Sequence, residues 1–179
     1  GRIETRLRDL AGIDSSLLAG AALVTSSALL DVVPDVWLAR LVRLCADARA
    51  RVLMVLNYDG RIACTPVDDD DGFVRDLVNR HQRGDKGLGP ALGPDSGARC
   101  AALLARAGYT VTMAKSDWVL DPDAGELQRQ LVAGWAHAAA EIAPEARPRI
   151  EAWAARRLAH IASGRSHIVV GHDDVAGVL

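Results

Sequence analysis

The chain has 179 residues, of which 50% are hydrophobic and 25% are charged, and its formal net charge at pH 7 is -2. A chain of this length and composition buries one ordinary core, which predicts a single globular domain. The near-neutral charge gives no sign of nucleic-acid binding, because phosphate-binding proteins carry a basic excess. No apolar run approaches the roughly 20 residues that span a bilayer. We therefore expect no membrane partner and a cytoplasmic location.

Neither the cysteines nor the acidic residues predict a metal site. Cys45, Cys64 and Cys100 are far apart and lack CxxC spacing, which favours buried, reduced thiols over a disulfide framework or a zinc site. The acidic run Asp68 to Asp71 lacks the glycine and the distal glutamate of a calcium-binding loop. Acidic residues favour a helix N-terminus, so the run is interpreted as the solvated start of a helix.

Strand and helix patterns alternate along the first part of the chain. Weak alternation predicts a strand over Ile3 to Leu7, and an apolar run predicts another over Ala21 to Thr25. Apolar residues at helical spacing predict a helix from Trp37 to Ala46. Arg51 to Asn57 is nearly continuous in apolar residues, as in a parallel strand covered on both faces, and Tyr58-Asp59-Gly60 predicts its end.

The second part of the chain is mainly helical. Gly108 and Gly164 are typical helix stops, and Asp95 or Ser96 is a typical N-cap. The predicted helices are 73–81, 95–106, 123–142 and 145–162, and the predicted strands are 109–113 and 166–171.

Five segments resemble, in this order, the later strands and turns of class I S-adenosylmethionine-dependent methyltransferases: RLRDLAG, ALVTSSALLDVV, RVLMVLNYDGR, LLARAGYTVTMAKSDWVL and SHIVVGH. The segments ALLD and DKGLGPALGP are similar to those of a bacterial subgroup. The family's sheet has the strand order 3-2-1-4-5-7-6, with the last strand antiparallel. The resemblance implies a Rossmann-like α/β fold without its first two strands. Residues 1–179 are then one partial domain from strand 3 onward, with residues 123–163 as a helical insertion before the last strand.

The chain departs from the family at the start of the domain. It contains neither the glycine-rich turn after strand 1 nor the acidic residue after strand 2, and GDKGLGP follows a predicted helix, which is the wrong context for a cofactor turn. We therefore expect strands 1 and 2 upstream of residue 1, in a parent protein longer by on the order of 80 to 100 residues. This chain alone is expected to be inactive, and its exposed sheet edges are expected to cause self-association.

The resemblance implies S-adenosyl-L-methionine as the cofactor. Asp9 and Leu10 are expected to bind the adenine, Ser26 and Ser27 to lie beside the methionine end, and Leu30 to pack near the adenosine. Asp31 is expected to face the reacting methyl group. The alternative is that Asp9, Ser27 and Asp31 only cap helices or contact solvent.

The substrate is expected at the ends of the later strands, and a small anionic or polar molecule is the favoured class. Asn57 and Tyr58 follow the strongest strand, although Tyr58 is also interpreted as a buried anchor. The stretch NRHQRGDKGLGPALGP, residues 79–94, joins two helices, and its glycines permit close approach to a ligand. Its candidate substrate-binding residues, with His81 as the candidate general base, are Asn79, Arg80, His81, Arg83 and Lys86. The alternative is a structured connection with paired or solvated charges.

Two other functional classes remain open at this point. One is a Rossmann-type enzyme that uses a nicotinamide cofactor, and the other is a noncatalytic Rossmann-like binding domain. The upstream sequence distinguishes them, because a methyltransferase has D-x-G-x-G after its first strand whereas a dehydrogenase has G-x-G-x-x-G.

Overall fold

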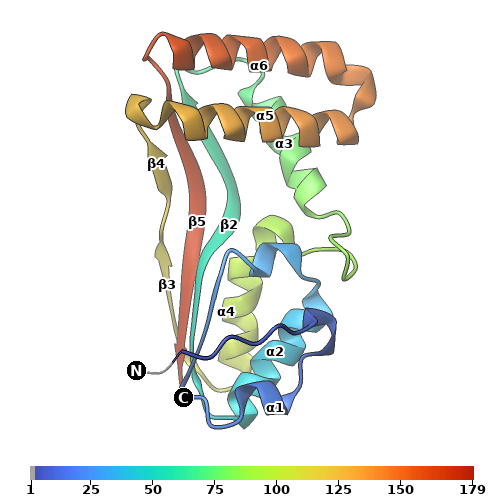
Figure 1. Cartoon of the computed structure of the whole chain (residues 1–179), viewed down its shortest axis with the longest axis vertical. Coiled ribbons are helices and arrows are strands. Elements are labelled where there is room, and N and C mark those ends of the chain that lie inside the picture. The colour runs from blue at the N-terminus through green and yellow to red at the C-terminus, as the bar shows by residue number, and fades with distance from the viewer. Residues whose placement is uncertain (1–2) are drawn as a thin grey trace.

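The computed structural model describes residues 3–179, which form an α/β fold with a mixed, open, five-stranded sheet (Figure 1). The strands are β1 (Leu23–Ser27), β2 (Arg51–Thr65), β3 (Thr110–Lys115), β4 (Trp118–Leu120) and β5 (His167–Val178). The α-helices are α1 (Ser15–Leu18), α2 (Asp35–Asp47), α3 (Asp71–Gln82), α4 (Ser96–Arg106), α5 (Gly125–Ile142) and α6 (Arg147–Ala162). Short 3-10 helices also occur: η1 (Leu10–Gly12), η2 (Leu30–Val32), η3 (Gly93–Asp95), η4 (Pro122–Ala124) and η5 (Pro144–Ala146).

The strand order β1-β2-β5-β3 places the last strand of the chain inside the sheet. β1 and β2 are parallel, whereas β5 runs antiparallel to both β2 and β3. β4 also pairs with β5, so β3 and β4 follow each other along the same side of this long strand (Figure 1). β2 and β5 therefore form a common spine for the whole molecule.

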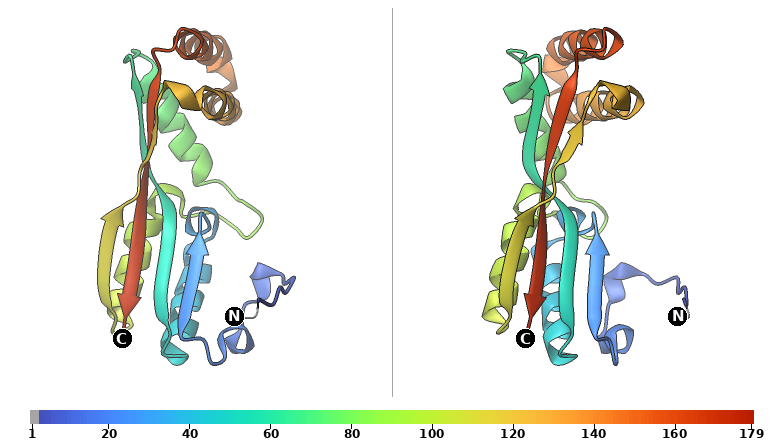
Figure 2. Two further views of the ribbon diagram at one scale, coloured as in Figure 1. Left: turned by 60° about the vertical axis from the view of Figure 1, so that its left-hand side comes forward. Right: turned by 90° about the vertical axis from the view of Figure 1, so that its left-hand side faces the viewer.

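The lower core lies between the sheet and helices α2 and α4. Val52 and Met54 of β2 and Val175 of β5 face these helices and are at most 2% exposed. From α2, Leu38 and Cys45 are fully buried in the same cluster. The two helices contact each other and lie on the same side of β1, β2, β5 and β3 (Figure 2). Alternation along the strands thus directs one set of side chains into this core.

The other face of the lower sheet carries exposed apolar side chains. Leu53 alternates with Val52 and Met54 and is 38% exposed, while Leu23 of β1 is 51% exposed and Val178 of β5 is 47% exposed. In an antiparallel or mixed sheet, a face that packs on nothing is usually polar. The lower sheet therefore has one packed face and one uncovered, partly apolar face.

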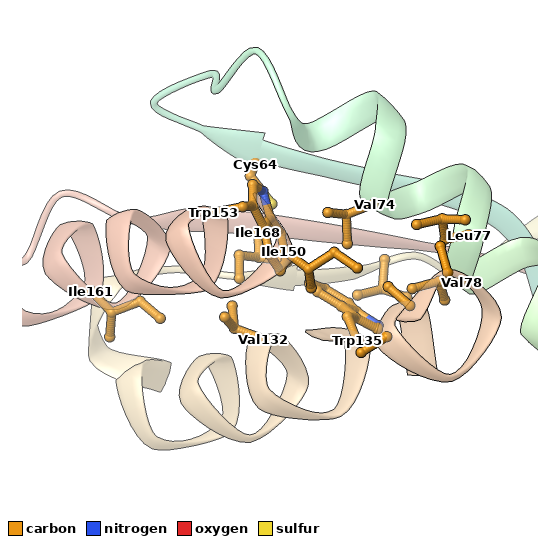
Figure 3. Close-up of a cluster of buried hydrophobic side chains, with 14 of the residues drawn as sticks. Cys64, Val74, Leu77, Val78, Val132, Trp135, Ile150, Trp153, Ile161 and Ile168 are labelled. Atoms are coloured by element: carbon orange, nitrogen blue, oxygen red, sulfur yellow. The ribbon is translucent and has the colours of Figure 1, made fainter. Parts of the chain in front are cut away.

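The upper core is formed by α3, α5 and α6 against the far halves of β2 and β5 (Figure 3). Trp153 and Ile150 of α6, Val132 of α5 and Ile168 of β5 are all at most 1% exposed. Figure 1 shows α5 and α6 as an antiparallel pair at the far end of the molecule, and both lie between β4 and β5 in the chain.

The prediction of a strand over Ile3 to Leu7 is wrong. These residues form no regular structure, and the side chains of Ile3 and Leu7 are 94% and 102% exposed. A strand needs a hydrogen-bonding neighbour, and within residues 3–179 this segment has none in the sheet. The alternating pattern alone is therefore insufficient.

Two strands are longer than predicted. Tyr58-Asp59-Gly60 does not end β2, because β2 continues to Thr65 and pairs with β5 along its whole second half. The pairing register shifts between Met54 and Asn57 and again between Tyr58 and Ile62, so the Asp-Gly signal marks an irregularity and not a turn. β5 likewise extends from His167 to Val178, well beyond the predicted end at Gly171.

The predicted helices are confirmed as α2 to α6, with shifted boundaries. The acidic run does start a helix, but three of its four side chains are paired with arginines and not simply solvated. Arg156 binds Asp68 and Asp70, and the buried Arg157 binds Asp71. No helix in the described part of the chain combines the length and apolar character needed to cross a bilayer.

Candidate functional site

Polar side chains lie where the two cores meet, between the carboxyl end of β1 and the middle of β2. In open α/β sheets ligands bind beyond the carboxyl ends of parallel strands, and of these two strands only β1 ends at this level. The backbone is strained just after β1 and at the first register shift of β2, because the non-glycine residues Ala28 and Leu56 have φ values of 50° and 56°. The Leu56 amide donates to Asp174 at 2.8 Å, which holds the irregularity in place. The residues that we call the waist site are Asp31, Asn57, Tyr58, Ser96 and His172.

Asn57 is 1% exposed and lies at the first register shift of β2. Its side-chain amide donates to the carbonyls of Met54 at 3.0 Å and of Asp173 at 2.9 Å. Its Oδ1 atom is buried and accepts no hydrogen bond from any described residue. Both N–H groups are therefore used, and an acceptor remains.

Ser96 begins α4 and is fully buried, and its Oγ atom also has no partner among residues 3–179. Neither Asp95 nor Ser96 provides the side-chain cap that the sequence predicts, because Asp95 binds Arg83 instead. The next residue, Gly97, lies so close to β5 that a Cβ atom there would be 3.2 Å from Cβ of Asp173. Glycine thus permits the N-terminus of α4 to touch the sheet beside Asn57.

Asp31 lies in η2, directly after β1, and its Oδ1 atom is buried without a partner in the described chain. Burial raises the pKa of this carboxyl group, while the backbone amide of Asp31 and the nearby His172 act in the opposite direction. This carboxyl group retains its proton to a higher pH than an exposed one.

His172 is 7% exposed and is the register partner of Tyr58. Its Nδ1 atom is 3.0 Å from the carbonyl oxygen of Val170, which can only accept, so Nδ1 carries a hydrogen. In the neutral ring Nε2 then has the free lone pair. The ring of Trp118 is 5.1 Å away and tilted by 42°, and the ring of Tyr58 is 6.3 Å away in an edge-on arrangement.

Tyr58 and Asn79 bind each other. The Tyr58 hydroxyl donates to Asn79 Oδ1 at 2.8 Å, and the Asn79 amide donates to the Gly60 carbonyl at 3.0 Å. Burial is the main cause that raises the pKa of the Tyr58 hydroxyl. Asn79 therefore connects α3 to β2 at the waist, and its polar groups have protein partners.

The remaining predicted substrate residues lie at the end of α3 and in the connection that follows. Asn79, Arg80 and His81 belong to α3 itself, and not to the loop. His81 is 2.9 Å from Glu141 of α5 and 3.3 Å from Lys86. Arg83 donates to Asp95 and to the Asn79 carbonyl, whereas Arg80 is exposed. The connection is also bound to the turn after β1, because the Leu92 amide donates to the Val33 carbonyl at 2.9 Å.

The predicted cofactor residues are not all available to a ligand. The Asp9 carboxylate caps η1 by accepting from Ala11, and the Leu10 carbonyl accepts from Trp37. The Ser26 hydroxyl lies 2.8 Å from the Met54 sulfur, while Ser27 is exposed. Leu30 is fully buried in the lower core, which leaves its side chain no surface for an adenosine. These five residues do not form a complete cofactor site.

The structure places Asp31 directly after β1 and places Asn57 and Tyr58 at the register shifts of β2, with Asn79 bound to Tyr58. Ser96 and His172 were missed by the sequence interpretation. Extending the last strand beyond Gly171 would have found His172, because it alternates with the inward-facing Ile168 and Val170. In the part of the chain that the structure describes, no three or more His, Cys, Asp or Glu side chains are placed to hold a metal ion.

No protein family model matches this chain. No curated protein matches it either. The waist site therefore has to be interpreted from its own chemistry and from the fold that presents it.

Proposed function

We propose that this chain is the C-terminal portion of a class I S-adenosylmethionine-dependent methyltransferase. The observation that carries the proposal is the position of β5. The parallel pair β1 and β2 is followed in the sheet by β5, which is antiparallel and comes last in the chain. The next strand in the sheet is β3, which comes earlier in the chain than β5. The resemblance implies this arrangement for strands 4, 5, 7 and 6.

The waist site gives second support. Asp31 follows the carboxyl end of the parallel strand β1, and open α/β sheets bind ligands at the carboxyl ends of their parallel strands. Asp31, which is implied to face the reacting methyl group, is partly buried and has an unpaired buried oxygen. A transferase that aligns two reactants needs such polar groups held in place by packed surroundings. The acceptor molecule then contacts the waist site, and the cofactor is held mainly by residues outside 3–179.

The test compares two lengths of the protein. Calorimetric titration with S-adenosylmethionine should show binding by a longer protein that includes the upstream coding sequence, and no measurable binding by residues 1–179. Binding by neither would contradict the methyltransferase proposal and favour a noncatalytic domain. Tight binding by residues 1–179 would contradict the view that the main cofactor contacts lie elsewhere.

A substitution in the longer protein tests the adenine contact separately. Asp9→Ala should weaken cofactor binding by about 1.5 to 3 kcal/mol, which is roughly ten- to a hundred-fold, because a charge-assisted hydrogen bond is lost. Glu4→Ala is the matched control, since Glu4 is an exposed acid of the same segment that pairs with Arg6. Equal effects of the two substitutions would indicate nonspecific electrostatics.

A further inference from the structure

A pocket that shares no residue with the waist site lies beside the start of α2. Its volume is about 320 Å³. This is near the lower end of the range for pockets that bind small molecules, so a ligand with a single ring fits it. Three separate segments of the chain supply its lining, which consists of Ala11, Pro34, Val36, Trp37, Arg40 and Leu88.

The part of the wall that α2 and η1 provide is apolar and fixed. Trp37 is 7% exposed, and its indole Nε1 donates to the Leu10 carbonyl at 2.6 Å. This hydrogen bond ties the first turn of α2 to the start of η1. Val36 precedes Trp37 and is 77% exposed, so its side chain is available to a ligand. A wall that is already ordered costs a ligand less conformational entropy on binding.

The glycine-rich connection between α3 and α4 supplies another part of the wall. The Asp85 carboxylate accepts from the amides of Gly87 at 2.7 Å and Gly89 at 3.0 Å. These glycines have φ values of 99° and 107°, which residues with a side chain rarely adopt. Leu88 lies between them, at the tip of a turn that its own hydrogen bonds close. The connection thus presents an apolar side chain to the pocket.

Arg40 is the one charged residue among the six that line the pocket. It is exposed and forms no ion pair within residues 3–179, whereas Asp35 of the same helix is bound by Arg99. A guanidinium group can bind a carboxylate through two parallel hydrogen bonds. An apolar pocket with one unpaired arginine is therefore complementary to a small apolar molecule that carries a single carboxylate.

We propose that this pocket binds a small aromatic carboxylate, with its ring between Trp37 and Leu88 and its carboxylate on Arg40. An aromatic ring suits the position, because stacking on an indole adds to the burial of apolar surface. The inference does not rest on the proposed function, since the site is built from residues 3–179 and needs no cofactor. The glycines at 87 and 89 then serve to hold Leu88 against the ligand.

The experiment is an NMR titration of the isotope-labelled 179-residue chain with sodium phenylacetate. The Trp37 indole signal should shift saturably, while the indole signal of Trp153, which is bound to Asp71 in the upper core, should not move. 2-Phenylethanol has the ring without the charge, and sodium acetate has the charge without the ring. Each should bind at least about ten-fold more weakly than phenylacetate, because each lacks one of the two kinds of contact.

Two outcomes of this titration would overturn the proposal. A shift of the Trp37 signal that does not saturate would show that the pocket holds no such ligand. Equal binding of phenylacetate and 2-phenylethanol would show that the pocket is merely apolar and does not recognise the carboxylate.

Variants locate the two contacts. Arg40→Gln should weaken phenylacetate binding at least about ten-fold and leave the weak binding of 2-phenylethanol unchanged. Arg43→Gln is the matched control, because Arg43 is an exposed arginine of the same helix that does not line the pocket, and it should bind phenylacetate as the wild type does.

Leu88→Ala should weaken the binding of both aromatic probes to a similar extent, since it removes an apolar contact and no charge. Near-ultraviolet circular dichroism verifies that each variant is folded. Wild-type affinity for phenylacetate in a folded Arg40→Gln protein would overturn the assignment of the carboxylate contact, and wild-type affinity in Leu88→Ala would overturn the role of the connection.

Discussion

Buried side chains in this protein are protected chemically as well as physically, and the three cysteines illustrate it. All three are free and buried. Burial raises the pKa of Cys45 to about 11 and the pKa values of Cys64 and Cys100 to about 12. Since the thiolate is the reactive form, burial reduces both its population and its access to reagents.

The native protein should therefore react with a thiol reagent at pH 8 roughly 100-fold or more slowly than an ordinary cysteine does, because the thiolate fraction is smaller by about that factor. Absorbance after addition of Ellman's reagent measures the rate. The same protein in guanidinium chloride is the control and should release all three equivalents at once. A fast native phase for one thiol would show that its part of the core opens.

His81 contacts Glu141 and Lys86, which is consistent with a structural role for this side chain. Its ring is 2.9 Å from Glu141, with the two side chains 26% and 52% exposed. His81→Ala and Glu141→Ala should each destabilise the protein modestly, with a coupling energy of about 0.2 to 1 kcal/mol in a double-mutant cycle. Urea unfolding of the four proteins gives this value.

Arg80 is the matched comparison, because it is the exposed neighbour of His81 in the same helical turn. Arg80→Ala should change the unfolding free energy by less than about 0.5 kcal/mol. In the longer protein, a loss of turnover by Arg80→Ala without a loss of stability would identify a substrate contact. Normal turnover by a folded Arg80→Ala, His81→Ala double variant would exclude the stretch from substrate binding.

At the scale of elements, the helices and four of the five predicted strands are present, but the lengths of β2 and β5 were underestimated and the strand predicted over Ile3 to Leu7 is absent, for a physical reason. The apolar spacing of α2 and the prolines in the first turns of η5 and α6 act within a few residues, so the sequence contains the signal locally. The length of β2 depends on β5, more than 100 residues later, and the segment Ile3 to Leu7 has strand alternation but no neighbour. Strand pairing depends on residues that are far apart in the sequence, so local alternation of apolar and polar residues cannot predict it.

The same distinction applies to the candidate site. Asp31, Asn57 and Tyr58 were candidates because they follow apolar strands directly. Ser96 and His172 join them only because α4 touches β5 and because β5 runs past Gly171. The order of strands in the sheet decides that the N-terminus of α4 meets β5 at the waist. This order cannot be predicted from the patterns of a single sequence.

The start of α3 is bound to α6 by arginine and aspartate side chains, which predicts a specific dependence of stability on pH. Hydrogen bonds from Arg156 hold the pKa of Asp68 at about 2, below its ordinary value of 3.8. A carboxyl group with a lowered folded-state pKa stabilises the fold above its unfolded pKa. This stabilisation is lost as the pH falls from about 4 through about 2.

Arg156→Gln should lower the unfolding free energy modestly at pH 7, because the arginine is 44% exposed and its ion pairs are screened by solvent. The difference from the wild type should persist at pH 5 and shrink towards zero near pH 2. Urea unfolding at these pH values measures it. Arg165→Gln is the control, since Arg165 binds the Ser163 hydroxyl and not a carboxylate. An undiminished difference near pH 2 would show that Arg156 acts through packing.

At the scale of the whole molecule, the sheet has an open side at β1. Its single partner in the described sheet is β2. The Arg51 amide donates to the Ala22 carbonyl and the Ala28 amide donates to the Val55 carbonyl, so the backbone groups of Ala22 and Ala28 face β2. By alternation, the backbone groups of Leu23, Thr25 and Ser27 point outward. This edge has no charged residue, proline or bulge, which are the features that usually protect an edge from pairing.

We therefore predict that the 179-residue chain self-associates through β1. A two-fold axis through Thr25 would pair LVTSS with itself in antiparallel register and continue the sheet across two copies. Sedimentation velocity over a concentration series should show an increasing sedimentation coefficient for the wild type. Thr25→Lys, at an exposed edge position whose own backbone groups do not bind β2, should remain monomeric over the same range.

Leu53→Lys separates edge pairing from stacking of the uncovered faces, because Leu53 lies on that face but in the interior strand β2. If copies associate by edge pairing, Leu53→Lys should still associate while Thr25→Lys does not. If the faces stack, both lysines should abolish association, since each places a charge on the apolar surface that the contact would bury. A wild-type chain that sediments as a monomer at every concentration would contradict both arrangements. It would show that water binds the outward-facing backbone groups of β1.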